Sequence, residues 1–208
     1  FLICSFDLLG TDRTLCKKVR QTLPLPPERV WVCATHTHSA PRGAFSGGIS
    51  QDDCYIASIV NSCKAAALAA LEDLLPARAQ WAEPAAEEVA SLRDAPRAQS
   101  AFAMPLLSLR LERAGNPLRW LRFQCHPTIL DERNLSYSRD LPGGIGGEQT
   151  GFSNGACADL STRFTRQNSS AEEVCRMGSL IRAALAQADY REDAAFGSVL
   201  RPVSRELE

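Results

Sequence analysis

The chain has 208 residues, of which 45% are hydrophobic and 23% are charged, a composition typical of globular domains. Its 23 Lys and Arg residues nearly balance its 24 Asp and Glu residues, which leaves a formal net charge of -1 and no run of like charge. This balance argues against a nucleic acid as partner. At this length we expect one domain that buries about 70% of the surface of its unfolded chain.

No membrane-spanning segment is expected from the hydrophobic pattern. The Ala-rich segment 65–75 is interrupted by Glu72 and Asp73, so it falls short of the roughly 18 residues that a span needs. The chain opens at Phe1 without an initiator Met, a basic segment or a cleavage site, so no secretory signal is visible. We therefore expect a piece of a longer protein.

Eight cysteines are scattered along the chain without a CxxC pair, which argues against a zinc ribbon and a thioredoxin-type site. Several lie in apolar segments, where a free thiol behaves as a small hydrophobic side chain. We expect mostly buried thiols in a reducing compartment, although their even number leaves disulfides open.

The first part of the chain predicts two strands joined by a helix. Residues 1–9 form a nearly continuous apolar run, which is typical of a strand covered on both faces. A helical pattern begins at Thr11 and ends before Pro24, and residues 29–34 predict a second buried strand. Strands connected in this way are expected to be parallel. A capping-box-like start at 50–53 then predicts a long helix that ends by Pro76.

The remainder predicts further strands and one more helix, so that the whole chain is an α/β fold with a mixed β-sheet and flanking helices. The stretch 84–97 carries no clear pattern, and the glycines of 143–147 are expected to form a mobile loop. The expected elements are a strand starting at 78–81, a hairpin of 106–111 and 118–125, a short strand at 150–153, a helix that Ser170 caps, and a last strand at 195–203.

All three histidines lie in two short segments, each directly after a predicted strand. His36 and His38 follow the second strand, and His126 follows the hairpin. Ligands bind at the carboxyl ends of strands in α/β sheets, and on extended backbone the two side chains of an H-x-H pair point the same way. Because imidazole is a natural zinc ligand, the pattern predicts a zinc site at these strand ends. The alternative is that each histidine is a solvated or hydrogen-bonded residue without a metal.

Four sequence blocks resemble the N-terminal catalytic domain of the neutral/alkaline ceramidase family, and they occur in the family's order. The resemblance implies that 1–208 is a single ceramidase-like catalytic domain, as a fragment that lacks its N-terminal start and its C-terminal part. Ala40, Ala158 and Thr162 depart from the Gly, Gly and Pro that are usual in the family, which leaves the substrate open. The blocks are THTHSAP at 35–41, CHPTIL at 125–130, SRDLPG at 138–143 and NGACADLS at 154–161.

The resemblance implies that His36 and His126 bind zinc and that His38 is the catalytic acid/base residue. Zinc activates a bound water for attack on an amide carbonyl, and an unligated imidazole suits proton transfer to the departing amine. The family takes two further zinc ligands, a Glu and a Tyr, from beyond the equivalent of Glu208. The segment alone is therefore expected to bind zinc weakly.

Three further residues are candidates for a supporting role. Asp140 and Asp159 are expected to orient ligating imidazoles or to hold loops, since carboxylates often do so. Arg42 is a candidate for contact with a substrate oxygen, with a solvated loop arginine as the alternative. Ser153 and Ser161 lack the G-x-S-x-G pattern of a nucleophile and are expected to serve hydrogen bonding in the fold.

The predicted function is zinc-dependent amide hydrolysis resembling that of neutral ceramidase, which splits N-acylsphingosine into sphingosine and a fatty acid. One alternative is a zinc hydrolase of the same family that acts on another N-acyl or ester substrate. Another is a non-catalytic relative that has lost the metal. The expected partner is a lipid or other N-acyl small molecule, reached by contact with a membrane surface. The compartment stays open, because the cysteines favour the cytoplasm whereas many relatives are secreted.

Overall fold

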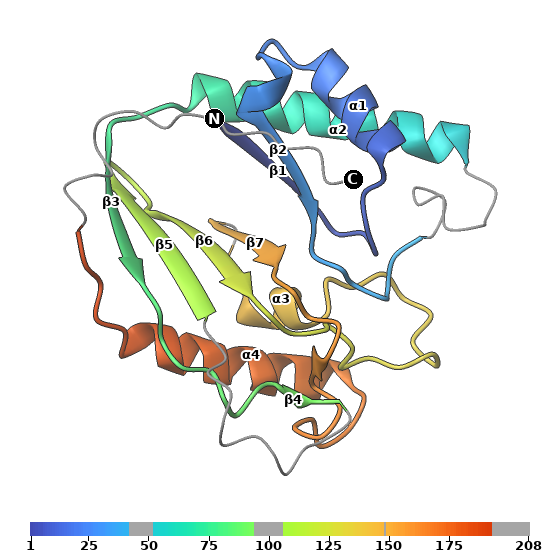
Figure 1. Cartoon of the computed structure of the whole chain (residues 1–208), viewed down its shortest axis with the longest axis vertical. Coiled ribbons are helices and arrows are strands. Elements are labelled where there is room, and N and C mark those ends of the chain that lie inside the picture. Colours follow the sequence, from blue (N-terminus) through green and yellow to red (C-terminus); the bar gives the residue numbers. More distant parts are fainter. Residues whose placement is uncertain (42–51, 94–105, 148, 193–208) are drawn as a thin grey trace.

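The computed structural model describes residues 1–41, 52–93, 106–147 and 149–192 (Figure 1). Its first strands, β1 (Leu2–Phe6) and β2 (Val30–Ala34), pair in parallel and are joined through helix α1 (Arg13–Thr22) and a 3-10 turn (Pro27–Arg29). The predicted βαβ unit is therefore confirmed. Strand β1 is only partly buried, which differs from the expected coverage of both faces.

Helix α2 (Asp53–Glu72) follows, and the side chain of Asp52 caps it by accepting a hydrogen bond from the Tyr55 amide. It packs with α1 over β1 and β2, and both helices lie above these strands in Figure 1. The result is an N-terminal hydrophobic core. Its buried members include Cys4, Leu15, Val19, Val32, Ile56 and Val60.

By length and composition alone, α2 meets the requirement for a helix that crosses a membrane. An 18-residue window of it has a mean hydropathy of 1.5, and 22% of that window is buried. The expectation that no stretch is long enough was wrong, because Glu72 is the last residue of the helix and Asp73 lies beyond it. The buried residues Ile56, Val60 and Ala67 nevertheless give the helix a packed face against the N-terminal core.

A four-stranded sheet with the order β3-β5-β6-β7 forms the other half of the molecule. The predicted hairpin is confirmed, since β5 (Leu106–Arg113) and β6 (Leu118–Phe123) are antiparallel neighbours. Strand β3 (Ala77–Ala82) pairs antiparallel with β5, and β7 (Thr150–Asn154) pairs parallel with β6. The unassigned stretch contributes the short β4 (Ser91–Leu92), which pairs with β8 (Leu160–Ser161).

Two helices pack on this sheet. Helix α4 (Ala171–Ala186) begins at the predicted cap, with the Ser170 hydroxyl accepting from the Glu173 amide, and it lies below the sheet in Figure 1. The glycines of 143–147 do not form the expected mobile loop, because helix α3 (Leu141–Ile145) includes Gly143 and Gly144. Gly144 touches Gly178 of α4 so closely that neither position has room for a side chain.

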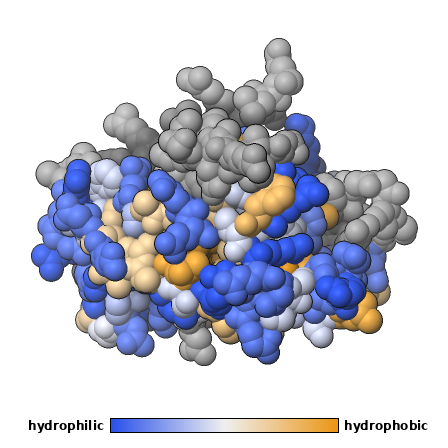
Figure 2. Space-filling model, turned by 90° about the horizontal axis from the view of Figure 1, so that it is seen from below, coloured by the Kyte–Doolittle hydropathy of each residue, from blue (hydrophilic) through white to orange (hydrophobic). Residues whose placement is uncertain are grey.

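The sheet arrangement differs from the single mixed sheet that we expected. Strands β1 and β2 form one sheet and β3, β5, β6 and β7 another, and contacts such as that of the Ser5 hydroxyl with the Phe152 carbonyl join them. The expected last strand at 195–203 lies outside the described residues. Seen from below, the surface is mostly hydrophilic with scattered hydrophobic side chains (Figure 2).

The eight cysteines are unpaired in the structure. Only Cys4 and Cys125 are buried, whereas Cys54 and Cys175 are exposed and the others lie between these extremes. The expectation of mostly buried thiols was therefore too strong. Burial raises the pKa of the Cys125 thiol and favours its neutral form.

Candidate metal centre

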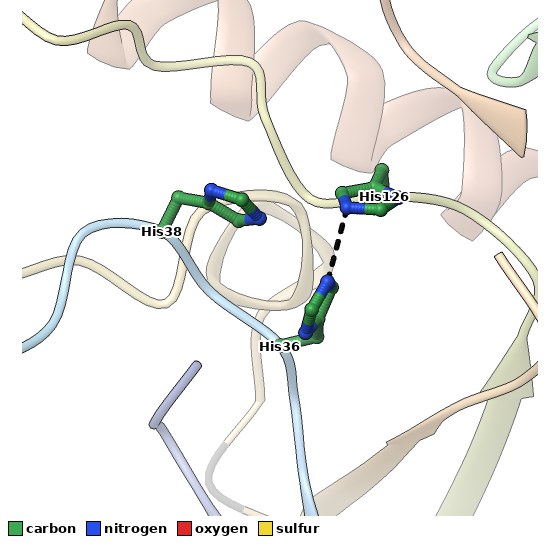
Figure 3. Close-up of side chains that lie close together, drawn as sticks. All are labelled: His36, His38 and His126. Atoms are coloured by element: carbon green, nitrogen blue, oxygen red, sulfur yellow. Dashed lines mark hydrogen bonds between the residues drawn. The ribbon is translucent and has the colours of Figure 1, made fainter. Parts of the chain in front are cut away.

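The three histidines converge at one point, where β2 and β6 end (Figure 3). The Nε2 atoms of His36 and His126 are 3.0 Å apart, although the two residues are 90 positions apart in the sequence. The ring of His38 lies at a centroid distance of 5.1 Å from His36 and 5.3 Å from His126. One nitrogen from each ring lies within 4.8 Å of the others, so these residues could hold a metal ion.

The backbone at His36 is left-handed, with φ of 67°, which differs from the extended H-x-H geometry that we expected. Such a conformation is unfavourable for a residue with a side chain and persists only where the surroundings impose it. The rings of His36 and His38 nevertheless lie close together, in an edge-to-face arrangement with an interplanar angle of 87°. The turn at His36 directs its ring toward His126 (Figure 3).

Backbone carbonyls orient the two rings that face each other. His36 Nδ1 lies 2.6 Å from the Leu9 carbonyl oxygen, and His126 Nδ1 lies 2.9 Å from the Cys157 carbonyl oxygen. A carbonyl only accepts hydrogen bonds, so each Nδ1 carries a hydrogen and the Nε2 of a neutral ring presents a lone pair. Any residue has a carbonyl, so the sequence contained no signal for these partners.

Two Nε2 lone pairs that face each other at 3.0 Å repel unless a proton or a cation lies between them. Burial lowers the pKa of His126, which favours the neutral imidazole over the protonated one. Neutral imidazole is the form that binds metals. Nitrogens at the usual Zn–N distance in a tetrahedral site are about 3.4 Å apart, close to the separation here. The chemistry of the donors therefore fits a metal such as Zn²⁺.

Neighbouring segments hold the two strand ends in place. The Asn154 side-chain amide donates to the Thr35 carbonyl at 3.4 Å and to the Cys125 carbonyl at 3.2 Å, so that it bridges the residues that precede His36 and His126. The Thr37 hydroxyl donates to the Ser138 carbonyl at 2.6 Å. These contacts join residues 35–37 to positions 138 and 154, and position 154 to position 125, so the site is held by segments that are distant in the sequence.

Asp140 holds the loop that follows His126. The residue is 1% exposed, and its carboxylate accepts hydrogen bonds from the amides of Ile129, Leu130 and Leu141. Burial raises the pKa of this carboxyl, and the bonds from the three amides oppose that shift. Its backbone is also left-handed, with φ of 55°.

The other predicted supporting residues are placed differently. Asp159 is exposed, and its backbone carbonyl accepts from the Arg93 amide at 2.8 Å. Arg42 lies outside the described residues. Ser153 accepts a hydrogen bond from the Trp120 indole, and Ser161 accepts one from the Arg163 amide, so both serve the fold.

A cavity of about 590 Å³ opens beside the histidines. His38 and His126 form part of its wall, and three arginines, Arg93, Arg163 and Arg166, also line it. No sequence motif marks these arginines, because they are dispersed along the chain. The cavity gives a small molecule access to two of the three imidazoles.

The fold of this chain is similar to part of two solved ceramidase structures. Over 89% of its length it matches a structure described as "Ceramidase complexed with C2", with a TM-score of 0.75 and 17% sequence identity. It also matches the crystal structure of neutral ceramidase from Pseudomonas aeruginosa over 89% of its length, with a TM-score of 0.74 and 18% identity. The chain spans 35% and 36% of the length of these two proteins. No family model and no curated protein matches the sequence.

Proposed function

We propose that the protein is a zinc-dependent hydrolase of N-acyl amides, with the zinc held by His36 and His126. The observation that carries this proposal is the pair of Nε2 atoms that face each other at 3.0 Å, each on a ring whose Nδ1 donates to a backbone carbonyl. The fold shared with neutral ceramidase supports an N-acylated lipid such as N-acylsphingosine as the substrate. Residues 1–208 would then form part of a single catalytic domain.

In this proposal His38 is the acid/base residue. A zinc ion bound at the two Nε2 atoms would supply an activated water and polarise the scissile carbonyl. The ring of His38 is close to both proposed ligands and lines the open cavity, so it can take a proton from the attacking water. It then returns that proton to the amide nitrogen as the C–N bond breaks, and the products are a carboxylic acid and an amine.

Catalytic zinc usually has three protein ligands and an open position. His36 and His126 supply two ligands, and the resemblance to ceramidases leads us to propose that a Glu and a Tyr beyond residue 208 add two more, one above the usual three. His38 is the competing candidate, because one of its nitrogens lies within 4.8 Å of the nitrogens of both proposed ligands. Removal of each histidine in turn separates these two arrangements.

The test uses the full-length protein, in which the proposed Glu and Tyr are present, and compares His36→Ala, His126→Ala and His38→Ala by zinc content and by hydrolysis. All are made in a Cys54→Ser/Cys175→Ser background, because these two exposed thiols could bind zinc adventitiously. Zinc is measured by elemental mass spectrometry after dialysis. Hydrolysis is measured with a short-chain fluorescent N-acylsphingosine, a simple N-acyl amine and the corresponding ester. The background protein is the matched control.

We expect His36→Ala and His126→Ala to lose zinc and activity together. His38→Ala should keep its zinc and lose about 10²- to 10⁴-fold in kcat. Loss of zinc from His38→Ala would make it a third ligand and move the acid/base role elsewhere. A background protein that binds no zinc and hydrolyses none of the substrates would overturn the proposal in favour of a non-catalytic relative.

A further inference from the structure

The cavity beside the histidines carries an excess of positive charge. Arg93, Arg163 and Arg166 line it together with the acidic residues Asp131 and Glu132. Asp131 is already paired with Arg133, at 2.6 Å, and this partner holds the pKa of its carboxyl down at about 2. Glu132 is therefore the acidic group of this wall that is left to balance three guanidinium groups.

The cavity arginines make no ion pair with the residues that the structure describes. Arg93 donates to the Ala158 carbonyl at 3.1 Å, and Arg163 lies with its guanidinium carbon 5.5 Å from the centre of the Phe164 ring. Arg166 donates through Nη1 to the carbonyls of Thr128 and Ile129. These neutral partners orient the side chains and leave their charges uncompensated.

Arg166 is the most firmly held of the three. It is half-buried, and its two carbonyl contacts lie in the loop that follows His126. They engage the Nη1 hydrogens, which leaves the hydrogens on Nε and Nη2 for a ligand. The charge of Arg166 opposes, as the smallest of several causes, the rise that burial produces in the pKa of Asp140, but the carboxylate of Asp140 is occupied by three backbone amides.

A guanidinium with a planar set of unused donors matches a carboxylate or a phosphate. We propose that the substrate carries such an anionic group, which Arg163 and Arg166 bind while the scissile amide lies at His38 and His126. This inference rests on the proposed hydrolase function and names its substrate class: N-acyl compounds with a negatively charged head group, such as N-acyl amino acids or phosphorylated N-acyl amines.

The test uses two pairs of probes that differ in charge and little in shape. N-lauroylglycine is compared with N-lauroylglycinamide, and O-phosphoryl N-lauroylethanolamine with N-lauroylethanolamine. Each probe is measured below its micelle concentration for equilibrium binding by calorimetry and, with the zinc-loaded protein, for release of lauric acid. We expect the charged member of at least one pair to bind about tenfold to hundredfold more tightly, as for hydrogen bonds to a charged group. The probe pair that shows the preference identifies the anionic group that the site binds, a carboxylate or a phosphate.

The arginine variants separate a specific site from general attraction. Arg163→Gln and Arg163→Glu should reduce the ratio of charged to neutral binding, Arg163→Lys should restore part of it, and Arg166→Lys should reduce it because a single ammonium replaces the planar donors. Arg29→Gln is the matched control, since this exposed arginine precedes β2 at the end opposite His36. The melting temperature of each variant is recorded, so that a folding defect in Arg166→Lys is recognised. If Arg166→Lys is misfolded, the effect of Arg163→Gln on the ratio of charged to neutral binding decides the test.

The two proposals fail in different ways. Equal binding of charged and neutral probes, or a preference that persists in both Arg163→Gln and Arg163→Glu, would overturn the anionic substrate and leave the hydrolase proposal in place. A preference that depends on Arg163, in a zinc-loaded protein that hydrolyses no probe, would support the anion site and count against the hydrolase.

Discussion

Gly144 of α3 and Gly178 of α4 meet backbone to backbone: a Cβ on Gly178 would lie 2.0 Å from the carbonyl carbon of Gly144. A side chain cannot shift away from a backbone as it can from another side chain. Gly178→Ala should therefore lower the free energy of unfolding by about 3 kcal/mol. Urea denaturation measures this, with the exposed Ser179→Ala on the same helix as a control expected to change stability by about 0.5 kcal/mol or less. Equal stability of the two variants would contradict this close contact.

Removal of the Asp140 side chain should destabilise the loop that carries His126. Asp140→Ala leaves two buried amides and one partly buried amide without their acceptor, which should lower the free energy of unfolding by about 2–4 kcal/mol. Asp140→Asn keeps one side-chain oxygen and should be less damaging. Urea denaturation ranks the three proteins, and an Asp140→Ala protein as stable as the wild type would disprove the role of this carboxylate in the fold.

Asn154 should matter for the metal more than for the fold. It bridges the carbonyls of Thr35 and Cys125, so Asn154→Leu, which keeps the branching and the number of heavy atoms, removes the link between the two strand ends while it fills the space. We expect zinc affinity to fall by roughly tenfold to a hundredfold, as for residues that support metal ligands. Competition with a fluorescent zinc chelator measures this affinity. Unchanged affinity would show that the strand ends are held without this bridge.

Zinc removal should lower thermal stability in the wild type and not in the ligand variants. A ligand that binds only the folded state adds about 2.7 kcal/mol when its free concentration is 100 times its Kd. Differential scanning calorimetry with and without EDTA should therefore show a lower melting temperature for metal-free wild type. His36→Ala and His126→Ala should show no such difference, and a shift of equal size in all three would place the zinc elsewhere.

Acid should remove a contribution to stability that comes from Glu173. Arg176, whose guanidinium lies 2.7 Å from its carboxylate, holds the pKa of Glu173 below the ordinary value of 4.5. A carboxylate with a lowered pKa in the folded state contributes stability above the unfolded pKa, and this contribution is lost as the pH falls through the folded pKa. Glu173→Gln should thus be less stable than the wild type at pH 7, with the difference shrinking below about pH 4. A difference that is independent of pH would contradict the ion pair.

Local sequence patterns predicted much of the fold, but they did not predict the contacts between segments that are distant in the sequence. The Ser170 cap predicted the start of α4, and turn residues predicted the β5–β6 hairpin. The sequence did not indicate that Gly144 lies in a helix, because Gly178, which makes room for it, is 34 positions away. The convergence of the histidines was expected from strand ends, but the left-handed backbone of His36 and the orienting carbonyls depend on tertiary contacts.

The proposed ligands belong to different halves of the molecule, since His36 follows the two-stranded sheet and His126 follows the four-stranded one. An ion shared by these residues would close a loop of 90 positions and tie the halves together, in the way that a disulfide would. The concentration of available metal would then determine the lifetime of the folded protein as well as its activity. Without the bound ion, the two halves would separate more readily, and the segments between them would become accessible to proteases.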